Sequence, residues 1–305
     1  MSPIFLFISC GFVILAVIMN RVNIYLIALC SAVVLSSCDF MERNKPLVNE
    51  VGKAVVSELL SDKQAEEPSG GAASTASADD KLLGQTSPAG MEEQMLRREG
   101  YTASYNKTTK LPNWVAWHLT ADRTEGPAKR SGVDFEADMD VPAPRAEDSD
   151  YYGSGYDRGH MCPAADNKYS ERAMRESFLF TNMCPQNGNL NRGDWNEMEM
   201  ACRRWAKKYG GLYIVCGPIL YKGKHKTIGR NKVIVPEAFF KVVLCMGKEP
   251  KAIGFIYKNA EGNRPKGDYV NTVDEVERIT GIDFFPLLPD DVESRVEATA
   301  DIGEW

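Results

Sequence analysis

The sequence predicts an α+β fold in which helices flank a central, mostly antiparallel sheet. Two observations carry this prediction. Short runs rich in aromatic and β-branched residues recur between residues 101 and 257, and glycine, proline or lysine bounds several of them. Only a few stretches with helical spacing interrupt these runs, which is typical of an α+β domain.

The expected strands differ in composition. Residues 101–105 and 113–120 combine aromatic and β-branched side chains with partial alternation, so both are predicted as strands. Residues 178–180 are predicted as a short apolar strand. The predicted central strands are the apolar runs 212–216, 239–246 and 252–257.

Two helices are predicted from their spacing. The first follows Asp194, whose carboxylate can cap the first turn, and Gly210-Gly211 ends it. Its buried stripe is expected to consist of Met198, Cys202, Trp205 and Tyr209. The second helix covers residues 272–280, and Gly281 ends it.

The N-terminal 38 residues are apolar and differ from the rest of the chain. Residues 3–19 are nearly all apolar, and a second apolar run reaches Leu35. One interpretation is a membrane helix or a hairpin of two, and the alternative is a secretory signal that starts at Met19 instead of Met1. Leu35-Ser36-Ser37-Cys38 favours the signal, because this pattern looks like a bacterial lipoprotein cleavage box. Residues 1–38 are therefore predicted to be a leader, with Cys38 lipidated.

Residues 39–95 are predicted to be a flexible tether between the leader and a globular domain of residues 96–305. Residues 69–78 are small and polar and cannot bury enough surface to offset their ordering entropy. A lipid anchor with a long tether would hold the domain at a bacterial membrane. The expected location is therefore outside the cytoplasm, either periplasmic or on the cell surface.

Two segments of the domain concentrate residues that suit phosphate chemistry. Asp157-Arg158-Gly159-His160 places an arginine and a histidine on either side of a glycine. Further along, residues four apart would form one stripe on a helix, and they are Asn191, Trp195, Glu199 and Arg203. An amide, a carboxylate and an arginine near a histidine suit a hard metal ion and a phosphate.

These segments resemble the DNA/RNA non-specific endonuclease family, the ββα-metal nucleases that are endonuclease G-like. The match also includes Asn182-x-x-Pro185-Gln186. Other segments fall in family order, namely Trp114-Val-Ala-Trp117, Val215-Cys-Gly-Pro218, Val235-Pro-Glu-Ala-Phe239 and Thr272-Val-Asp-Glu-Val-Glu277. The resemblance covers roughly the last 200 residues and implies a ββα-metal core and a nuclease activity.

The resemblance implies a role for each site residue. His160 would be the general base, because a neutral imidazole can take a proton near neutral pH. Asn182 would brace the site loop, and Asp157 would fix the turn from Arg158 to His160 by hydrogen bonding. The phosphate would be held by Arg158, Arg203 and Arg130. The two other histidines, His118 and His225, are expected to be structural or exposed.

The resemblance also implies one bound metal ion on Asn191. A lone amide oxygen is a weak ligand, which suits a Mg²⁺ ion that keeps most of its waters, and Mn²⁺ can substitute. Glu199 would accept hydrogen bonds from those waters. Family members often dimerise, so a homodimer is also implied, although no interface is evident in the sequence.

The formal net charge of the chain is −6, so the overall charge does not indicate a polyanionic partner. Two local clusters do. One is a basic loop of Lys222, Lys224, Lys226, Arg230 and Lys232, and the other ends a helix with Arg203, Arg204, Lys207 and Lys208. Each cluster alone is explained equally well as a solvated face. Together, on either side of the expected site, they favour a track for DNA or RNA.

Three functions are compatible with these residues. The first is a metal-dependent endonuclease that cuts DNA and RNA without strong sequence preference. The second is a phosphodiesterase for nucleotides or small diesters, against which the basic flanks argue mildly. The third is an inactive nucleic-acid-binding lipoprotein, against which the presence of His160, Asn191 and Glu199 argues.

Five of the eight cysteines lie in the predicted domain, namely Cys162, Cys184, Cys202, Cys216 and Cys245. Export permits disulfides, but an odd number leaves at least one thiol unpaired, and the connectivity cannot be deduced. The spacings lack the paired cysteines of a structural zinc site.

Overall fold

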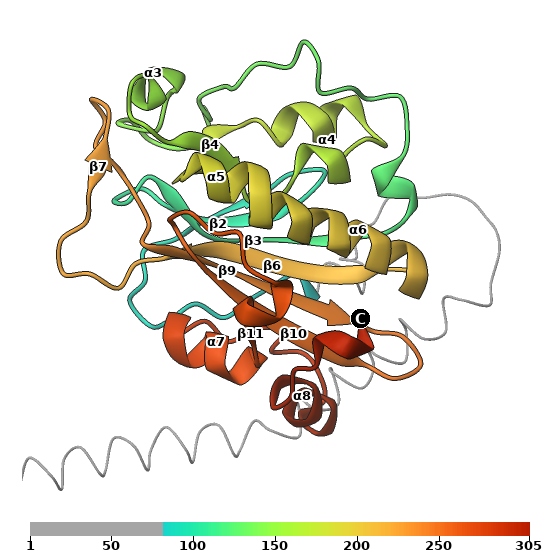
Figure 1. Cartoon of the computed structure of the whole chain (residues 1–305). Coiled ribbons are helices and arrows are strands. Elements are labelled where there is room, and N and C mark those ends of the chain that lie inside the picture. The colour runs from blue at the N-terminus through green and yellow to red at the C-terminus, as the bar shows by residue number, and fades with distance from the viewer. Residues whose placement is uncertain (1–81) are drawn as a thin grey trace, which may run out of the picture. The chain divides into compact units, whose positions relative to one another are not determined.

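The computed structural model describes residues 82–305 (Figure 1). The predicted leader, Cys38 and most of the predicted tether lie outside these residues. Within residues 82–305, no helix combines the length and apolar character needed to cross a membrane.

A seven-stranded antiparallel sheet forms the centre of the fold, as predicted. Its strand order is β1-β2-β3-β6-β9-β10-β11. The strands are β1 (Gln94–Arg97), β2 (Thr102–Asn106), β3 (Leu111–Leu119), β6 (Leu212–Ile219), β9 (Ala238–Cys245), β10 (Lys251–Lys258) and β11 (Val270–Asn271). Two small antiparallel pairs stand apart from it, β4 (Asp157–His160) with β5 (Met183–Gln186) and β7 (Thr227–Ile228) with β8 (Val233–Ile234).

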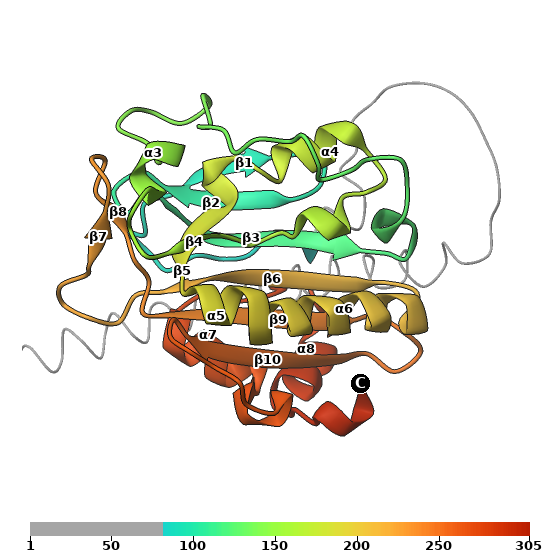
Figure 2. The ribbon, with the colours of Figure 1, turned by 45° about the horizontal axis from the view of Figure 1, so that its top comes forward.

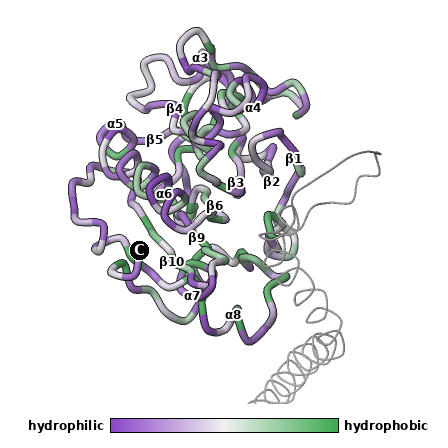
Figure 3. Tube along the Cα trace, turned by 90° about the vertical axis from the view of Figure 1, so that its right-hand side faces the viewer, coloured by the Kyte–Doolittle hydropathy of each residue, from purple (hydrophilic) through white to green (hydrophobic). Residues whose placement is uncertain are grey.

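Helices cover both faces of this sheet. They are α3 (Asp148–Tyr151), α4 (Glu171–Glu176), α5 (Gly188–Leu190), α6 (Asn196–Tyr209), α7 (Val273–Thr280) and α8 (Asp290–Glu297). Figure 2 shows α6 in front of the sheet and α7 and α8 behind it. The buried side chains form two separate clusters, one on each face of the sheet, because successive residues of β3 point to opposite faces. Val115 and Trp117 face the α6 side, whereas Trp114 and Ala116 face the α7 side. In Figure 3, the strands accordingly run between α6 and the pair α7 and α8.

Most predicted elements are present, but residues 178–180 are not a strand. The amide of Phe178 donates to the carbonyl of Arg175, and that of Leu179 to the carbonyl of Glu176, so both continue the end of α4. Phe180 then begins a 3₁₀ turn. Because the amides of Phe178 and Leu179 form these local hydrogen bonds, the segment pairs with another part of the chain only through an isolated bridge between Glu136 and Leu179.

The predicted helix after Asp194 exists, and Gly210 ends it in the left-handed conformation with φ of 90°. Its start differs from the prediction. Residues Asn191–Trp195 form a π-helical turn that leads directly into α6, and Gly193 within it has non-helical angles. Asn191 therefore lies across a kink from Glu199 and Arg203, and the four stripe residues do not share one regular helix.

Asp194 does not cap α6. Trp195 precedes the helix in helical conformation, so the first amides of α6 continue an existing turn. The Asp194 carboxylate instead accepts hydrogen bonds from the Asn263 amide, at 2.6 Å, and from the Tyr269 hydroxyl. It thereby ties the segment before β11 to the start of α6.

The packed region begins before residue 96, where the sequence placed the start of the domain. Leu82 and Leu83 are buried in the cluster on the α7 side. The Trp114 indole donates to the Ser87 hydroxyl at 3.2 Å, and Thr86 pairs with Asp283. Because these contacts are made with distant segments, residues 82–95 show no periodic apolar pattern from which their packing could be predicted.

The five cysteines among the described residues are all buried, and none forms a disulfide. Burial raises the pKa of Cys202 to about 12 and that of Cys216 to about 11. These thiols are therefore protonated at neutral pH.

Candidate active site

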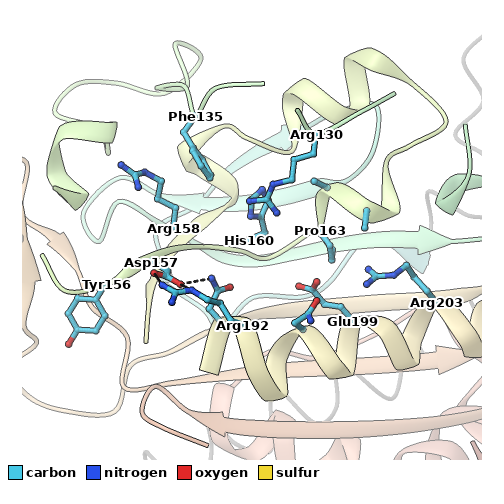
Figure 4. A pocket seen from close by; sticks show the side chains of 14 residues that line it. Arg130, Phe135, Tyr156, Asp157, Arg158, His160, Pro163, Arg192, Glu199 and Arg203 are labelled. Carbon is cyan, nitrogen blue, oxygen red and sulfur yellow. Dashed lines mark hydrogen bonds and ion pairs between the residues drawn. The ribbon is translucent and has the colours of Figure 1, made fainter. Parts of the chain in front are cut away.

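One open cavity of about 550 Å³ collects most of the predicted site residues. It lies between β4, the π-helical turn and α6 (Figure 4). The predicted residues that line it are Arg130, Arg158, His160, Asn191, Glu199 and Arg203. These residues come from segments far apart in the sequence, so the fold alone brings them together.

The pairing of β4 with β5 explains the glycine between Arg158 and His160. Gly159 lies opposite Cys184 in this antiparallel pair. A β-carbon added at Gly159 would approach the Gln186 Cβ to 2.6 Å, which is closer than real contacts allow. Only glycine lets the two strands come this close, and their contact places His160 at the cavity wall.

His160 lies in an apolar setting with one nitrogen unused. Its side chain is 8% exposed, and the Phe178 and Phe135 rings lie 5.0 and 5.6 Å from its ring. Its buried Nε2 atom has no hydrogen-bond partner among the described residues. Burial, aided by the positive charge of Arg130, lowers the pKa of His160 to about 3. The imidazole is therefore neutral at physiological pH and can act as a proton acceptor.

Asp157 orients Asn191, a contact that the sequence did not reveal. The Asn191 side-chain amide donates to the Asp157 carboxylate at 3.0 Å, and Arg192 donates to both of its oxygens. Asp157 was expected to fix its own turn, but its bonds run instead to the segment before α6. Because the carboxylate accepts from the amide nitrogen of Asn191, the amide oxygen remains available as an acceptor or a metal ligand.

Glu199 lines the cavity without an ion pair or hydrogen bond to any described residue. Burial raises the pKa of Glu199 to about 7, although Lys241, Arg203 and Arg130 act in the opposite direction. The Asn191 amide oxygen and the Glu199 carboxylate, which line one cavity, are hard oxygen donors. The donor set therefore fits a hard divalent cation.

The three predicted phosphate-binding arginines all reach the cavity, and neighbours hold each of them. Arg203 donates to the buried Asp166 carboxylate at 2.9 Å. Arg158 donates to Asp148 at 2.5 Å and stacks on several rings, namely Phe135, Tyr151 and Tyr152. Arg130 lies over the Phe178 ring and beside His160 in Figure 4. Aromatic contacts of this kind restrict a guanidinium without neutralising it.

Asn182 lies behind the cavity wall and does not line it. Its side chain donates to the carbonyls of Cys162 and Ser177, at 2.9 and 2.8 Å, and accepts from the Cys162 amide. With every polar atom engaged, the Asn182 side chain is held inside the fold. It braces the segment after His160, which is the role given to it in the sequence analysis.

A buried lysine below the cavity was missed by the sequence analysis. Lys241, on β9, is 1% exposed, and its ammonium lies 4.3 Å from the Trp195 ring and 5.1 Å from the Trp117 ring. Burial alone would lower its pKa, but the acidic groups around it, Glu199 and Asp166 among them, raise it, so the ammonium stays charged. Its charge acts electrostatically on the carboxyl groups of Glu199 and Asp166. The only sequence signal is one lysine in the otherwise apolar strand AFFKVVLC.

The basic loop lies at the edge of the cavity and not in it. Its five cationic residues are exposed on the segment that carries β7 and β8. Lys226 contacts the Tyr156 hydroxyl at 3.4 Å, and Tyr156 lines the cavity. Arg230 pairs with Glu147 at 3.6 Å. The loop can therefore contact only the parts of a ligand that extend beyond the cavity.

The fold and the cavity together define a class of protein: β4, β5 and α6 form a ββα unit around a histidine, an oriented amide and a carboxylate. The chain belongs to the DNA/RNA non-specific endonuclease family, whose model matches residues 79–291. The family is metal-dependent.

Individual relatives agree with this assignment. The chain is 36% identical over 207 residues to the mitochondrial nuclease EXOG of Xenopus laevis, covering 63% of this chain and 58% of the relative. It is 32% identical over 209 residues to human mitochondrial endonuclease G, covering 64% and 70%. A crystal structure of the EndoG/EndoGI complex matches with a TM-score of 0.62 at 30% identity, covering 65% of this chain and 87% of that one. The chain thus spans less than two thirds of the EXOG relatives.

Proposed function

We propose that this protein is a metal-dependent endonuclease that hydrolyses phosphodiester bonds of DNA and RNA without strong sequence preference. The observation that carries the proposal is the unpartnered Nε2 of His160, in one cavity with Asn191, Glu199 and three arginines. The names of the relatives, a mitochondrial nuclease and endonuclease G, support it.

The residues of the cavity divide the chemistry among them. His160 accepts the proton of the attacking water through its free nitrogen. Arg158, Arg203 and Arg130 place positive charge where the phosphate gains negative charge in the transition state. Because these contacts address the phosphate and not the base, they carry no sequence information.

We propose Mg²⁺ as the cation, held by Asn191 directly and by Glu199 through water, with Mn²⁺ able to substitute. When bound, such an ion neutralises phosphate charge and stabilises the leaving oxygen. Asp157 would keep the Asn191 oxygen directed at the ion, since it binds the amide nitrogen. Lys241 would limit the repulsion between Glu199 and Asp166.

A gel assay on plasmid DNA and on RNA, with and without EDTA, tests the activity. Internal cleavage of both polymers that EDTA abolishes is the expected result. Cleavage of a small aryl phosphodiester but of neither polymer would instead identify a small-diester phosphodiesterase. Binding without any cleavage would identify an inactive nucleic-acid-binding protein.

The basic loop is predicted to act on affinity for long polymers and not on the chemical step. Lys222→Ala, Lys224→Ala and Arg230→Ala together should weaken plasmid binding and flatten its salt dependence, by a log–log slope of up to roughly 0.9 per lost phosphate contact. A minimal diester, too short to reach the loop, should be cut as before. The measurement is kcat/KM for both substrates across a salt series.

Lys226 and Lys232 are kept in this variant, which removes three of the five cations of the loop. Lys248→Ala, an exposed lysine between β9 and β10, is the control. Equal losses on both substrates would mean that the loop shapes the site. No loss on either would make the loop a solvated face.

We propose that Cys38 carries a lipid and that the chain is exported and held at a bacterial membrane, periplasmic or at the cell surface. The support is the Leu35-Ser36-Ser37-Cys38 pattern after an apolar run. Cys38→Ser should abolish labelling by a lipid precursor and leave uncleaved or soluble protein. Unchanged labelling, or a mature chain that still starts at Met1, would contradict the anchor.

We also propose a homodimer, on the strength of the family resemblance alone. Light scattering on the purified protein should give twice the mass of one chain. A monomer mass over the working concentration range would exclude it.

A further inference from the structure

A second group of oxygen ligands lies on the other side of the molecule from the cavity. Asp274 and Glu277 belong to α7, and Glu297 ends α8. One carboxylate oxygen from each lies within 4.8 Å of the others. Both helices pack on the sheet face opposite α6, as Figures 1 and 2 show, so this cluster is separate from the proposed active site.

Glu297 is the unusual member of the cluster. It is only 4% exposed, and its Oε1 atom is buried without a hydrogen-bond partner. Within residues 82–305, no lysine or arginine forms an ion pair with any of the three carboxylates. Glu277 has one backbone donor, the amide of Phe284 at 2.7 Å. A buried carboxylate that faces two others and lacks a donor costs free energy unless a cation compensates it.

The spacing suits one ion. Two oxygens that each lie about 2.4 Å from the same Ca²⁺ are separated by at most roughly 4.8 Å. Calcium accepts irregular sets of six to eight oxygens, whereas magnesium requires near-octahedral geometry and usually keeps several waters. Three carboxylates from two helices, with Asp274 exposed enough to admit water, therefore favour calcium.

We propose that Asp274, Glu277 and Glu297 form a Ca²⁺ site that ties α7 to α8. The ion would replace repulsion between the helices with shared ligands. It would not take part in catalysis, because the sheet separates it from His160 and Glu199.

The competing state is a proton-sharing cluster. Burial, together with repulsion from Glu277 and Glu293, raises the pKa of Glu297 to about 9, so without a cation this carboxyl holds a proton at neutral pH. A protonated cluster needs no metal and would not respond to calcium. Calcium titration distinguishes the two states directly.

The experiment uses the full chain with Asn191→Ala, which removes the proposed direct ligand of the active-site ion. Calorimetric titration with CaCl₂ should show one bound Ca²⁺, and adding Glu297→Gln should abolish it. The unfolding temperature of the Asn191→Ala chain should rise by about 5–10 °C when free Ca²⁺ exceeds Kd a hundredfold. With Glu297→Gln the temperature should not respond.

Two further variants keep the test decisive. Asp274 is exposed, so Asp274→Asn should fold even where Glu297→Gln does not, and it should weaken calcium binding at least tenfold. Asp291→Asn, an exposed acid of α8 outside the cluster, should keep the full response. The proposal is overturned by equal calcium responses in Asp274→Asn and the parent, or by stabilisation with Mg²⁺ but not Ca²⁺.

Discussion

Replacing His160 with alanine is expected to lower kcat for plasmid cleavage at least ~100-fold, the usual contribution of a positioned general base. The described part of the chain offers no substitute, because His118 and His225 do not line the cavity. The measurement is kcat at saturating Mg²⁺ and DNA, so that weaker binding does not enter. A rate near wild type would show that His160 is not the base.

His225→Ala is the matched control for this variant. Its ring pairs with Glu237 at 3.1 Å, outside the cavity, so its loss should leave kcat nearly unchanged. The pH profile adds a second check. Because the pKa of His160 is lowered to about 3, the neutral base persists as the pH falls and is lost only near that value. An acid limb of kcat between pH 5 and 8 therefore belongs to another group.

The second large effect concerns the cation. Excess chelator should abolish cleavage, and Asn191→Ala should cost about as much as the loss of His160 because it removes the only proposed direct ligand. This variant should also lose the response of kcat to added Mg²⁺. The measurement is kcat across a Mg²⁺ series for the wild type and the variant.

Asn189→Ala controls for the loss of an amide near the same turn. Asn189 is exposed and lies outside the cavity, so this variant should keep a normal response to Mg²⁺. Full activity of the wild type in excess chelator would contradict the metal requirement. A normal Mg²⁺ response in Asn191→Ala would move the ion to other ligands.

The sequence alone was sufficient for the family and for most of the regular structure. Thr272 caps the first turn of α7 and Gly281 ends its last turn, so both helix ends depend on neighbouring residues in the sequence and can be recognised from it. Apolar runs such as 239–246 become strands because both faces are buried, and their composition records that burial. The candidate site residues His160, Asn191 and Glu199 could also be chosen from the sequence, because the residue type alone determines whether a side chain can accept a proton or bind a cation.

What only the tertiary structure decided depends on contacts between distant segments. The four-residue spacing from Asn191 to Arg203 does not reveal the kink at Gly193. A π-helical turn changes the direction in which the following side chains point, but the amino-acid composition of the segment does not record this change. The hydrogen bond from Asn191 to Asp157 requires the β4–β5 pair and the kink at once. In the sequence Lys241 looks like any lysine in a strand, and only the packed structure shows that its ammonium lies against the Trp117 and Trp195 rings. Residue type and period are local properties, whereas the orientation of a ligand and the burial of a charge belong to the packed fold.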